Sequence, residues 1–229
     1  MNFNRLNVSV KGPGHLLCGQ PNQDASFVSY VPSGWLAVVC DGMGSKPYSQ
    51  IGARQACRAV ADTVKKSSFP IGSKDLIKAI YQLWLTYLGR TKPNEAVTTC
   101  LFCWLSHEGE ARTFQLGDGL IIISDKAHDN ADKNSFGNET TGLGKSTKFS
   151  DWNVTDHKLK PGDVVALMTD GISEDIYSGM EMEFLYEIYK NIENKSIRQA
   201  KFWLKNEFRN WATPNHQDDK SLALLVLKK

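Results

Sequence analysis

The sequence predicts an α+β fold in which mainly antiparallel sheets are covered by pairs of helices. The 229-residue chain contains roughly eight to ten short apolar runs bounded by turn-forming residues, a pattern typical of strands. It also contains two pairs of segments with apolar residues at helical spacing. The strands do not alternate with the helices one for one, which argues against a doubly wound parallel sheet. One domain over residues 1–229 is expected from this length.

The first segments predict a strand, a turn and a hairpin. Residues 6–17 are expected to form an opening strand and a turn at Gly12-Pro13-Gly14. Two further strands, at 25–30 and 35–40, flank the turn sequence Pro32-Ser33-Gly34. A short connection of this kind joins antiparallel neighbours, so at least part of the sheet is antiparallel.

Helices are expected next, over about residues 48–66 and 74–88, because apolar residues recur there at intervals of three and four. Ser73 is the predicted N-cap of the second helix and Gly89 its stop. The rest of the chain repeats both kinds of element. Strands are predicted at 97–105, 111–116, 120–124, 152–156, 163–169 and 221–227, and helices at 181–191 and 196–211.

The long polar stretch at residues 125–148 is rich in Asn, Asp, Ser, Thr and Gly. It predicts a mobile surface loop without strands, which we describe as flap-like because long loops often cover functional sites.

Composition excludes several classes of protein. The net charge of +2 and the dispersed basic residues argue against a nucleic-acid binder. The apolar runs are far shorter than the roughly 20 residues of a membrane span, and the start of the chain lacks a signal-peptide core. Five cysteines, an odd number, favour reduced core thiols and a cytoplasmic protein. Cys100 and Cys103 match a redox spacing, but in a strand they would face opposite sides.

Carboxylates stand at the ends of several predicted buried strands. Asp41-Gly42 follows the strand at 35–40, Asp170-Gly171 follows 163–169, and Asp218-Asp219 precedes 221–227. A single Asp-Gly is more often only a turn. Several such carboxylates brought together would repel, by roughly 3 kcal/mol for each pair at ~5 Å. A shared divalent cation would remove this cost, and the pattern therefore favours a cation site.

The order of these and other short motifs resembles that of the metal-dependent protein phosphatases, the protein phosphatase 2C family, and most closely its compact bacterial members. The motifs are Asn22-Gln23-Asp24, Val39-Cys40-Asp41-Gly42-Met43-Gly44, Val97-Thr98-Thr99, Leu116-Gly117-Asp118, Gly142-Leu143-Gly144, Pro161-Gly162-Asp163, Met168-Thr169-Asp170-Gly171 and Asp218-Asp219. The resemblance covers residues 8 to 228 and rests on the register of eight weak motifs.

The resemblance implies a four-layer α-β-β-α sandwich and hydrolysis of phosphoserine or phosphothreonine by a water activated at two Mn²⁺ or Mg²⁺ ions. Carried over to this chain, Asp41 would bridge both ions and the Gly42 carbonyl would bind one of them. The remaining carboxylates would have distinct parts: Asp170 and Asp218 would hold the second ion, Asp24 would act through a metal-bound water, and Asp118 would support a third, weaker ion. The ligands are all oxygens, which suits Mg²⁺ and Mn²⁺.

Four positions depart from the family pattern. Gly19 stands where a phosphate-binding arginine is usual, Gln23 replaces a glutamate, Ser45 a glycine, and Asp219 an asparagine. His15 is a candidate substitute for the arginine and is predicted to be catalytic together with Asp41 and Asp24. The alternative, a histidine with only a structural part, stays open, as does Lys46 as the phosphate-binding residue.

The function predicted from these observations is a metal-dependent protein serine/threonine phosphatase of a bacterial cytoplasm. Phosphorylated proteins are its expected substrates, an opposing kinase its expected partner, and a monomer its expected state, with no nucleic acid or membrane partner. The alternative is a weak or inactive member of the same fold that binds phosphoproteins. An aspartyl-nucleophile phosphatase is disfavoured because Met43 stands where a second aspartate would be needed.

Overall fold

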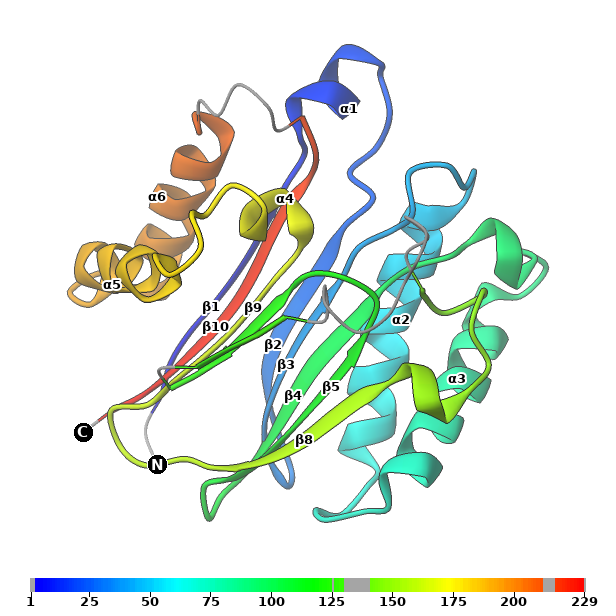
Figure 1. Ribbon diagram of the computed structural model, residues 1–229, viewed down its shortest axis with the longest axis horizontal. Helices are drawn as coiled ribbons and strands as arrows, with labels where there is room; N and C mark the ends of the chain where they lie inside the picture. Colours follow the sequence, from blue (N-terminus) through cyan, green and yellow to red (C-terminus); the bar gives the residue numbers. More distant parts are fainter. Residues whose placement is uncertain (1–2, 125, 130–140, 212–216, 229) are drawn as a thin grey trace.

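The computed structural model describes residues 3–124, 126–129, 141–211 and 217–228. In this part of the chain, two five-stranded antiparallel sheets pack face to face, and helices cover the outer face of each sheet (Figure 1). The predicted α+β class and the four-layer sandwich are confirmed.

Strands from both ends of the sequence meet in the first sheet. In spatial order this sheet contains β1 (Phe3–Val10), β10 (Lys220–Leu227), β9 (Val164–Met168), β6 (Leu120–Ile123) and β7 (Lys126–Asp129). The second sheet contains β2 (Ala25–Val31), β3 (Gly34–Cys40), β4 (Cys100–Ser106), β5 (Glu110–Leu116) and β8 (Asn153–Lys158).

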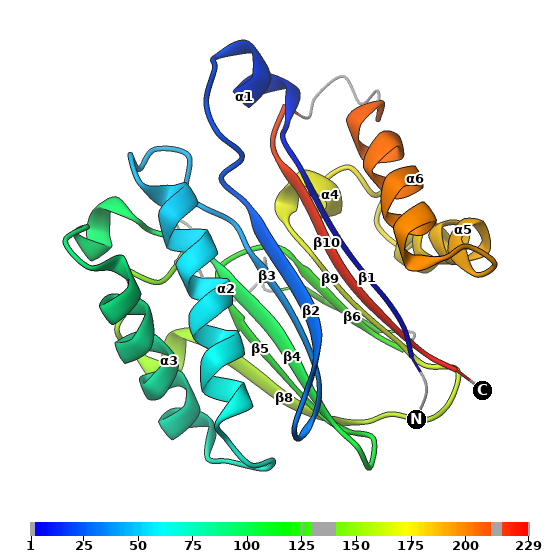
Figure 2. The same cartoon turned by 180° about the vertical axis from the view of Figure 1, so that it is seen from behind.

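Two helical pairs form the outer layers. The second sheet is covered by α2 (Ser49–Lys65) and α3 (Ser73–Leu88), and the first by α5 (Glu181–Ile192) and α6 (Ile197–Arg209) (Figure 2). The described chain also has the short elements α1 (Pro13–Leu17), α4 (Asp170–Ser173), η1 (Pro93–Glu95) and η2 (Phe149–Asp151). None of the described helices is long and apolar enough to cross a membrane.

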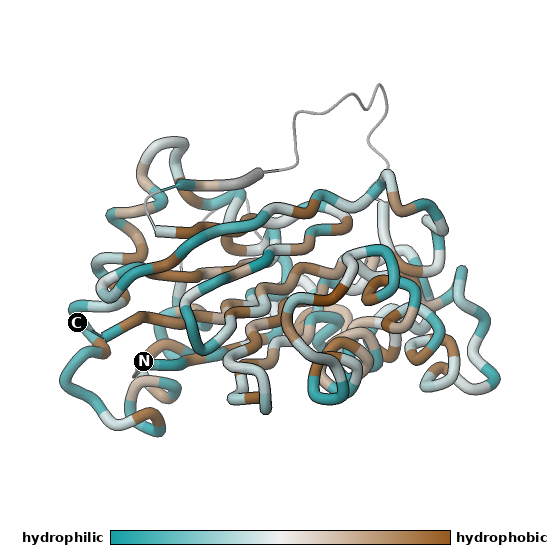
Figure 3. Tube along the Cα trace, turned by 90° about the horizontal axis from the view of Figure 1, so that it is seen from below, coloured by the Kyte–Doolittle hydropathy of each residue, from teal (hydrophilic) through white to brown (hydrophobic). Residues whose placement is uncertain are grey.

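Alternation along the strands divides the core into layers. On β3, Leu36, Val38 and Cys40 pack with the helices α2 and α3, whereas Ala37 and Val39 pack between the two sheets. All five residues are 0% exposed, because successive strand side chains point to opposite faces and both faces of this strand are covered. Figure 3 shows hydrophobic residues concentrated along the central strands.

The two cysteines with the redox spacing lie on opposite faces of β4. Cys100 belongs to the core beneath the helices and Cys103 to the core between the sheets. All five cysteines are free thiols, and burial raises the pKa of Cys103 to about 12. The expectation that this pair does not form a redox motif agrees with the structure.

Three local predictions are wrong. The turn expected within 6–17 is the helix α1, which Pro13 begins. Ser73 is the first residue of α3 rather than its N-cap, which is Gly72; the Ser73 hydroxyl instead accepts a hydrogen bond from Arg112. The strand expected from residue 97 begins only at Cys100, because Thr98 makes isolated bridges to Gly42 and Leu143 instead of joining the ladder of the sheet.

The stretch predicted as a strandless loop, 125–148, contains β7, whose register pairs Ile122 with Ala127. Residues 125 and 130–140 lie outside the described residues, so the flap-like character of that part stays a prediction. The following Leu143 exchanges two backbone hydrogen bonds with Thr98, which ties this part of the segment to the start of β4.

Candidate metal centre

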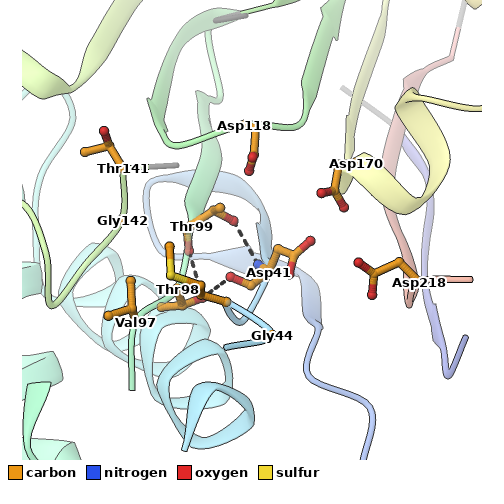
Figure 4. Close-up of a pocket in the computed structure, with 11 residues that line it drawn as sticks. Asp41, Gly44, Val97, Thr98, Thr99, Asp118, Thr141, Gly142, Asp170 and Asp218 are labelled. Atoms are coloured by element: carbon orange, nitrogen blue, oxygen red, sulfur yellow. Dashed lines mark hydrogen bonds between the residues drawn. The ribbon is translucent and has the colours of Figure 1, made fainter. Parts of the chain in front are cut away.

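Carboxylates from both sheets gather at one end of the sandwich. Asp41 follows β3, Asp118 lies between β5 and β6, Asp170 begins α4 directly after β9, and Asp218 precedes β10. All four line one cavity of about 140 Å³, and Figure 4 shows their carboxylates pointing toward its centre. The meeting of strand-end aspartates predicted from the sequence is therefore present in the structure.

The backbone of Asp41 is held by two threonines that precede β4. The Asp41 N–H donates to Thr99 Oγ1 at 2.8 Å, and the Asp41 carbonyl accepts from Thr98 Oγ1 at 2.8 Å and from the Thr99 N–H at 2.8 Å. With both backbone groups bonded, Asp41 projects its side chain from a fixed point. Sequence reasoning missed this part of Thr98 and Thr99, which are buried polar residues at a predicted strand start.

Glycine is required at residue 42 because other backbone segments pass against it. A Cβ atom there would lie 2.7 Å from the carbonyl oxygens of both Gln23 and Ser49. Real Cβ atoms do not approach other atoms this closely, so any side chain would push these segments apart. The predicted metal-binding carbonyl of Gly42 therefore belongs to a tightly packed segment, in which Gly42 also bridges to Thr98.

Asp24 is buried beside the cavity, at the start of β2. Its Oδ2 accepts a hydrogen bond from Thr169 Oγ1 at 2.9 Å, and Thr169 Oγ1 in turn accepts from the Ser221 N–H at 3.0 Å. Thr169 thus links β2 to β9 and β10, a role that sequence reasoning also missed. Asp24 does not line the cavity itself.

Two buried carboxylate oxygens lack any hydrogen-bond partner among the described residues: Oδ1 of Asp24 and Oδ1 of Asp170. Buried polar atoms are nearly always satisfied, and unsatisfied carboxylate oxygens are especially costly. Oxygen ligands of this kind suit a hard divalent cation such as Mg²⁺ or Mn²⁺. The described residues therefore fit a cation at this end of the sandwich.

The electrostatics of these carboxylates agree with this fit. Burial and the neighbouring carboxylates of Asp24 and Asp170 raise the pKa of Asp41 well above 3.8. Burial and the charge of Asp219 raise the pKa of Asp24 well above the same value. The pKa of Asp218 is also raised, by partial burial of its carboxylate and by the charge of Asp170, although the residue as a whole is exposed. Each group binds its proton more tightly than in water, because burial disfavours the charged form and a neighbouring carboxylate adds repulsion.

A different arrangement surrounds Asp219, which is 1% exposed. Its Oδ1 accepts from the Gly12 N–H at 2.7 Å and its Oδ2 from the Gln23 N–H at 2.6 Å. His15 Nδ1 lies 2.9 Å from Asp219 Oδ2, which is close enough for an ion pair when the imidazole is protonated, but no aligned hydrogen bond joins the two atoms. We call this group, Asp219 with Gly12, His15 and Gln23, the Asp219 clamp.

His15, predicted to bind phosphate, therefore lies on α1 against the Asp219 clamp. Ligand atoms of His15, Asp218 and Asp219 lie within 4.8 Å of one another, so the imidazole is close to the predicted metal ligand Asp218. Gly19, which replaces the usual arginine, is exposed and adopts φ +66°, and a Cβ atom there would meet nothing within 4 Å. The catalytic role of His15 stays a prediction.

Comparison with known proteins identifies the family. A family model for Protein phosphatase 2C matches residues 11–209. A comparison with curated proteins gives no match.

Solved structures of similar fold include the S. agalactiae serine/threonine phosphatase, with 14% identity and a TM-score of 0.71 over 99% of this chain and 100% of that one. PppA, described as a key regulatory component of T6SS in Pseudomonas aeruginosa, has 15% identity and a TM-score of 0.70 over 99% and 98% of the two chains. Serine/threonine phosphatase Stp1 from Staphylococcus aureus has 15% identity and a TM-score of 0.69 over 100% and 96%. The fold and the family match thus agree with the resemblance stated from the motifs, and the chain belongs to the protein phosphatase 2C family of enzymes.

Proposed function

We propose that this protein removes phosphate from phosphoserine and phosphothreonine in other proteins, using two Mn²⁺ or Mg²⁺ ions at the candidate metal centre. The observation that supports this most directly is the pair of unpartnered buried oxygens on Asp24 and Asp170 beside Asp41. Such a group is unfavourable without a cation, and the family to which the chain belongs supplies the matching chemistry.

In this proposal the Asp41 carboxylate and the Gly42 carbonyl would hold one ion, and Asp170 and Asp218 would hold the second together with Asp41. Asp24 would act through a water, and Asp118 would support a third, weaker ion. Bound there, two ions would activate a water for attack on phosphorus and offset the negative charge of the phosphoryl oxygens.

The residues of the chain itself prepare this chemistry. Thr98 and Thr99 fix the backbone of Asp41, so its carboxylate needs little reorganisation when a ligand binds. Thr169 fixes one oxygen of Asp24 and leaves the other without a partner, which orients that oxygen for a further contact. The absence of a side chain at Gly42 allows the backbone segments at Gln23 and Ser49 to pack against the residue that follows Asp41.

The second candidate function is a weak or inactive member that binds phosphoproteins without turnover. Gly19 favours it, because this residue offers no group to bind phosphate. The described aspartates favour the enzyme. Mn²⁺-dependent hydrolysis of p-nitrophenyl phosphate and of a phosphoserine peptide tests both candidates, with a chelator and Asp41→Asn as controls. Peptide binding without hydrolysis under all metal conditions would support the binding protein instead.

We also propose phosphorylated proteins as substrates, an opposing serine/threonine kinase, a monomeric state and a cytoplasmic location. Sedimentation or size-exclusion measurements test the monomer directly, and a dimer would contradict it.

A further inference from the structure

One buried carboxylate at the candidate metal centre has a role that the proposed metal ligands do not explain. Asp219 is among the most buried charged residues of the described chain, yet both of its oxygens already accept backbone hydrogen bonds. A carboxylate satisfied in this way has less need of a cation than Asp24 or Asp170, which each keep an unpartnered oxygen. Its oxygens are instead bonded to the backbone N–H groups of Gly12 and Gln23.

These contacts join the chain segments that present two predicted metal-site residues. Through Oδ2, Asp219 holds the N–H of Gln23, the residue directly before Asp24. Through its own N–H, it donates to Oδ1 of the adjacent Asp218 at 2.7 Å. A single residue therefore contacts both the start of β2 and the start of β10, which belong to different sheets.

The third contact of Asp219 is with Gly12, which lies directly before α1. The Gly12 N–H donates to Asp219 Oδ1, and a Cβ atom on Gly12 would lie 2.2 Å from the Asp218 carbonyl oxygen. The Gly14 N–H adds a bond of 2.9 Å to the Gln217 carbonyl. The segment 12–14 is thus packed directly onto the backbone of 217–218, which limits how far Asp218 can move.

We propose that Asp219 is a positioning residue that sets the relative placement of Asp24 and Asp218. This chain, unlike family members with an asparagine at this position, uses a carboxylate because both oxygens accept backbone N–H groups. The Gly12 and Gln23 N–H groups donate to different oxygens of Asp219. An asparagine has one acceptor oxygen, so its NH₂ group would face one of these N–H groups, and two donors cannot form a hydrogen bond with each other. The proposal rests on the proposed metal-dependent function. It differs from the predicted role of His15, which concerns the substrate.

The experiment compares Mn²⁺ binding by calorimetry with steady-state kinetics on a phosphoserine peptide, for wild type and Asp219→Asn. We expect the Mn²⁺ dissociation constant of Asp219→Asn to rise about tenfold or more, which corresponds to ~1.4 kcal/mol, and kcat to fall. His15→Ala leaves both backbone hydrogen bonds of Asp219 in place, so it should change the Mn²⁺ dissociation constant much less than Asp219→Asn does and should raise KM. In the His15→Ala background, Asp219→Asn should raise the Mn²⁺ dissociation constant by the same factor as it does in the wild type.

The matched control is Asp163→Asn, because Asp163 also accepts a backbone hydrogen bond, from the Lys160 N–H at 2.8 Å, but it lies outside the cavity lining. It should bind Mn²⁺ like the wild type. If Asp219→Asn lowers only the melting temperature and keeps wild-type Mn²⁺ affinity, Asp219 is merely structural and the proposal is overturned.

If Asp219→Asn does not fold, Asp219→Ser, which keeps a small acceptor, takes its place. If neither variant folds, amide exchange at Gln23 in the wild type decides: Mn²⁺ should slow it, and an unchanged rate overturns the proposal. A wild-type protein that neither binds Mn²⁺ nor hydrolyses the peptide would refute the proposed function itself. That result is distinct from a failure of the Asp219 variants alone.

Discussion

Two groups of carboxylates lie at the same end of the sandwich and are satisfied in opposite ways. The first, which we call the cavity group, comprises the aspartates that line the cavity together with the adjacent Asp24, which does not line it. In this group Asp24 and Asp170 each keep a buried oxygen without a partner, and burial and mutual repulsion raise the pKa of Asp41 and Asp24. In the Asp219 clamp, both carboxylate oxygens accept backbone hydrogen bonds. This contrast agrees with the proposed division of roles. Asp24 and Asp170, which are proposed to serve the ions, each keep an oxygen without a partner, whereas Asp219, which is proposed as a support, has both oxygens bonded.

The largest expected effect comes from the cavity group. Asp41→Asn should reduce Mn²⁺-dependent turnover at least tenfold, and in practice close to abolish it, because the residue proposed to contact both ions loses its charge. Asp170→Asn and Asp218→Asn should do nearly the same. Turnover is measured with p-nitrophenyl phosphate, and circular dichroism checks the fold. More than about a tenth of the wild-type rate in Asp41→Asn, a loss under ~1.4 kcal/mol, would exclude the two-ion proposal.

The second prediction concerns metal removal. A cation that binds only the folded state stabilises it by mass action, by ~2.7 kcal/mol per site at a hundredfold excess over the dissociation constant. Mn²⁺ should therefore raise the melting temperature of the wild type, and a chelator should reverse this. Asp41→Asn should show a smaller shift, measured by calorimetry. Equal shifts in both proteins would place the ion elsewhere.

The strands of the sandwich and most aspartates of the cavity group can be predicted from local sequence patterns. The strand predicted at 35–40 agrees with β3 to within one residue, because continuous apolar sequence between turn residues is a strong local signal. Short elements such as α1, α4 and β7 were missed, since four or five residues have no measurable period. The strand-end aspartates were found because the end of a buried strand is visible in the sequence.

The supporting contacts could not be predicted in the same way. The Gly12–Asp219 hydrogen bond joins residues 207 positions apart, and the Thr169–Asp24 bond joins residues 145 positions apart. Both depend on how the two sheets stack, which no local pattern specifies. The proximity of Asp219 to His15 was missed for the same reason: α1 was expected to be a turn, and its packing against the start of β10 is a tertiary feature.

The third prediction tests substrate binding separately from metal binding. If His15 binds phosphate, as the missing arginine suggests, His15→Ala should raise KM or lower kcat/KM by about 10–100-fold, or ~1.4–2.8 kcal/mol. The kinetics are measured on a phosphopeptide between pH 6 and 8. Wild-type kinetics across this range would leave His15 with a structural part in the Asp219 clamp and direct attention to Lys46.

The fourth prediction uses the pH dependence of the metal-free protein. Because the pKa of Asp24 and Asp41 is raised on folding, the folded state holds their protons above pH 3.8, where the unfolded chain begins to release them. Their contribution to stability is thus present below that pH and is lost as pH rises through the raised values. With a chelator present, Asp41→Asn should be more stable than the wild type at pH 7, and this gain should disappear at acidic pH. A constant difference in melting temperature across pH would contradict the raised pKa.

The smallest expected effect comes from restoring an arginine at residue 19. The structure leaves room for a side chain there, but φ +66° is a left-handed conformation that costs an ordinary residue about 1 kcal/mol. Gly19→Arg in the His15→Ala background should therefore recover only part of the lost kcat/KM, about threefold, since a guanidinium can bind phosphate through two hydrogen bonds. Gly19→Ala is the matched control, because it has the same backbone cost and no charge. If Gly19→Ala and Gly19→Arg give the same kcat/KM on the phosphopeptide, the guanidinium does not reach the phosphate, and substrate recognition depends on the cavity group rather than on the segment around α1.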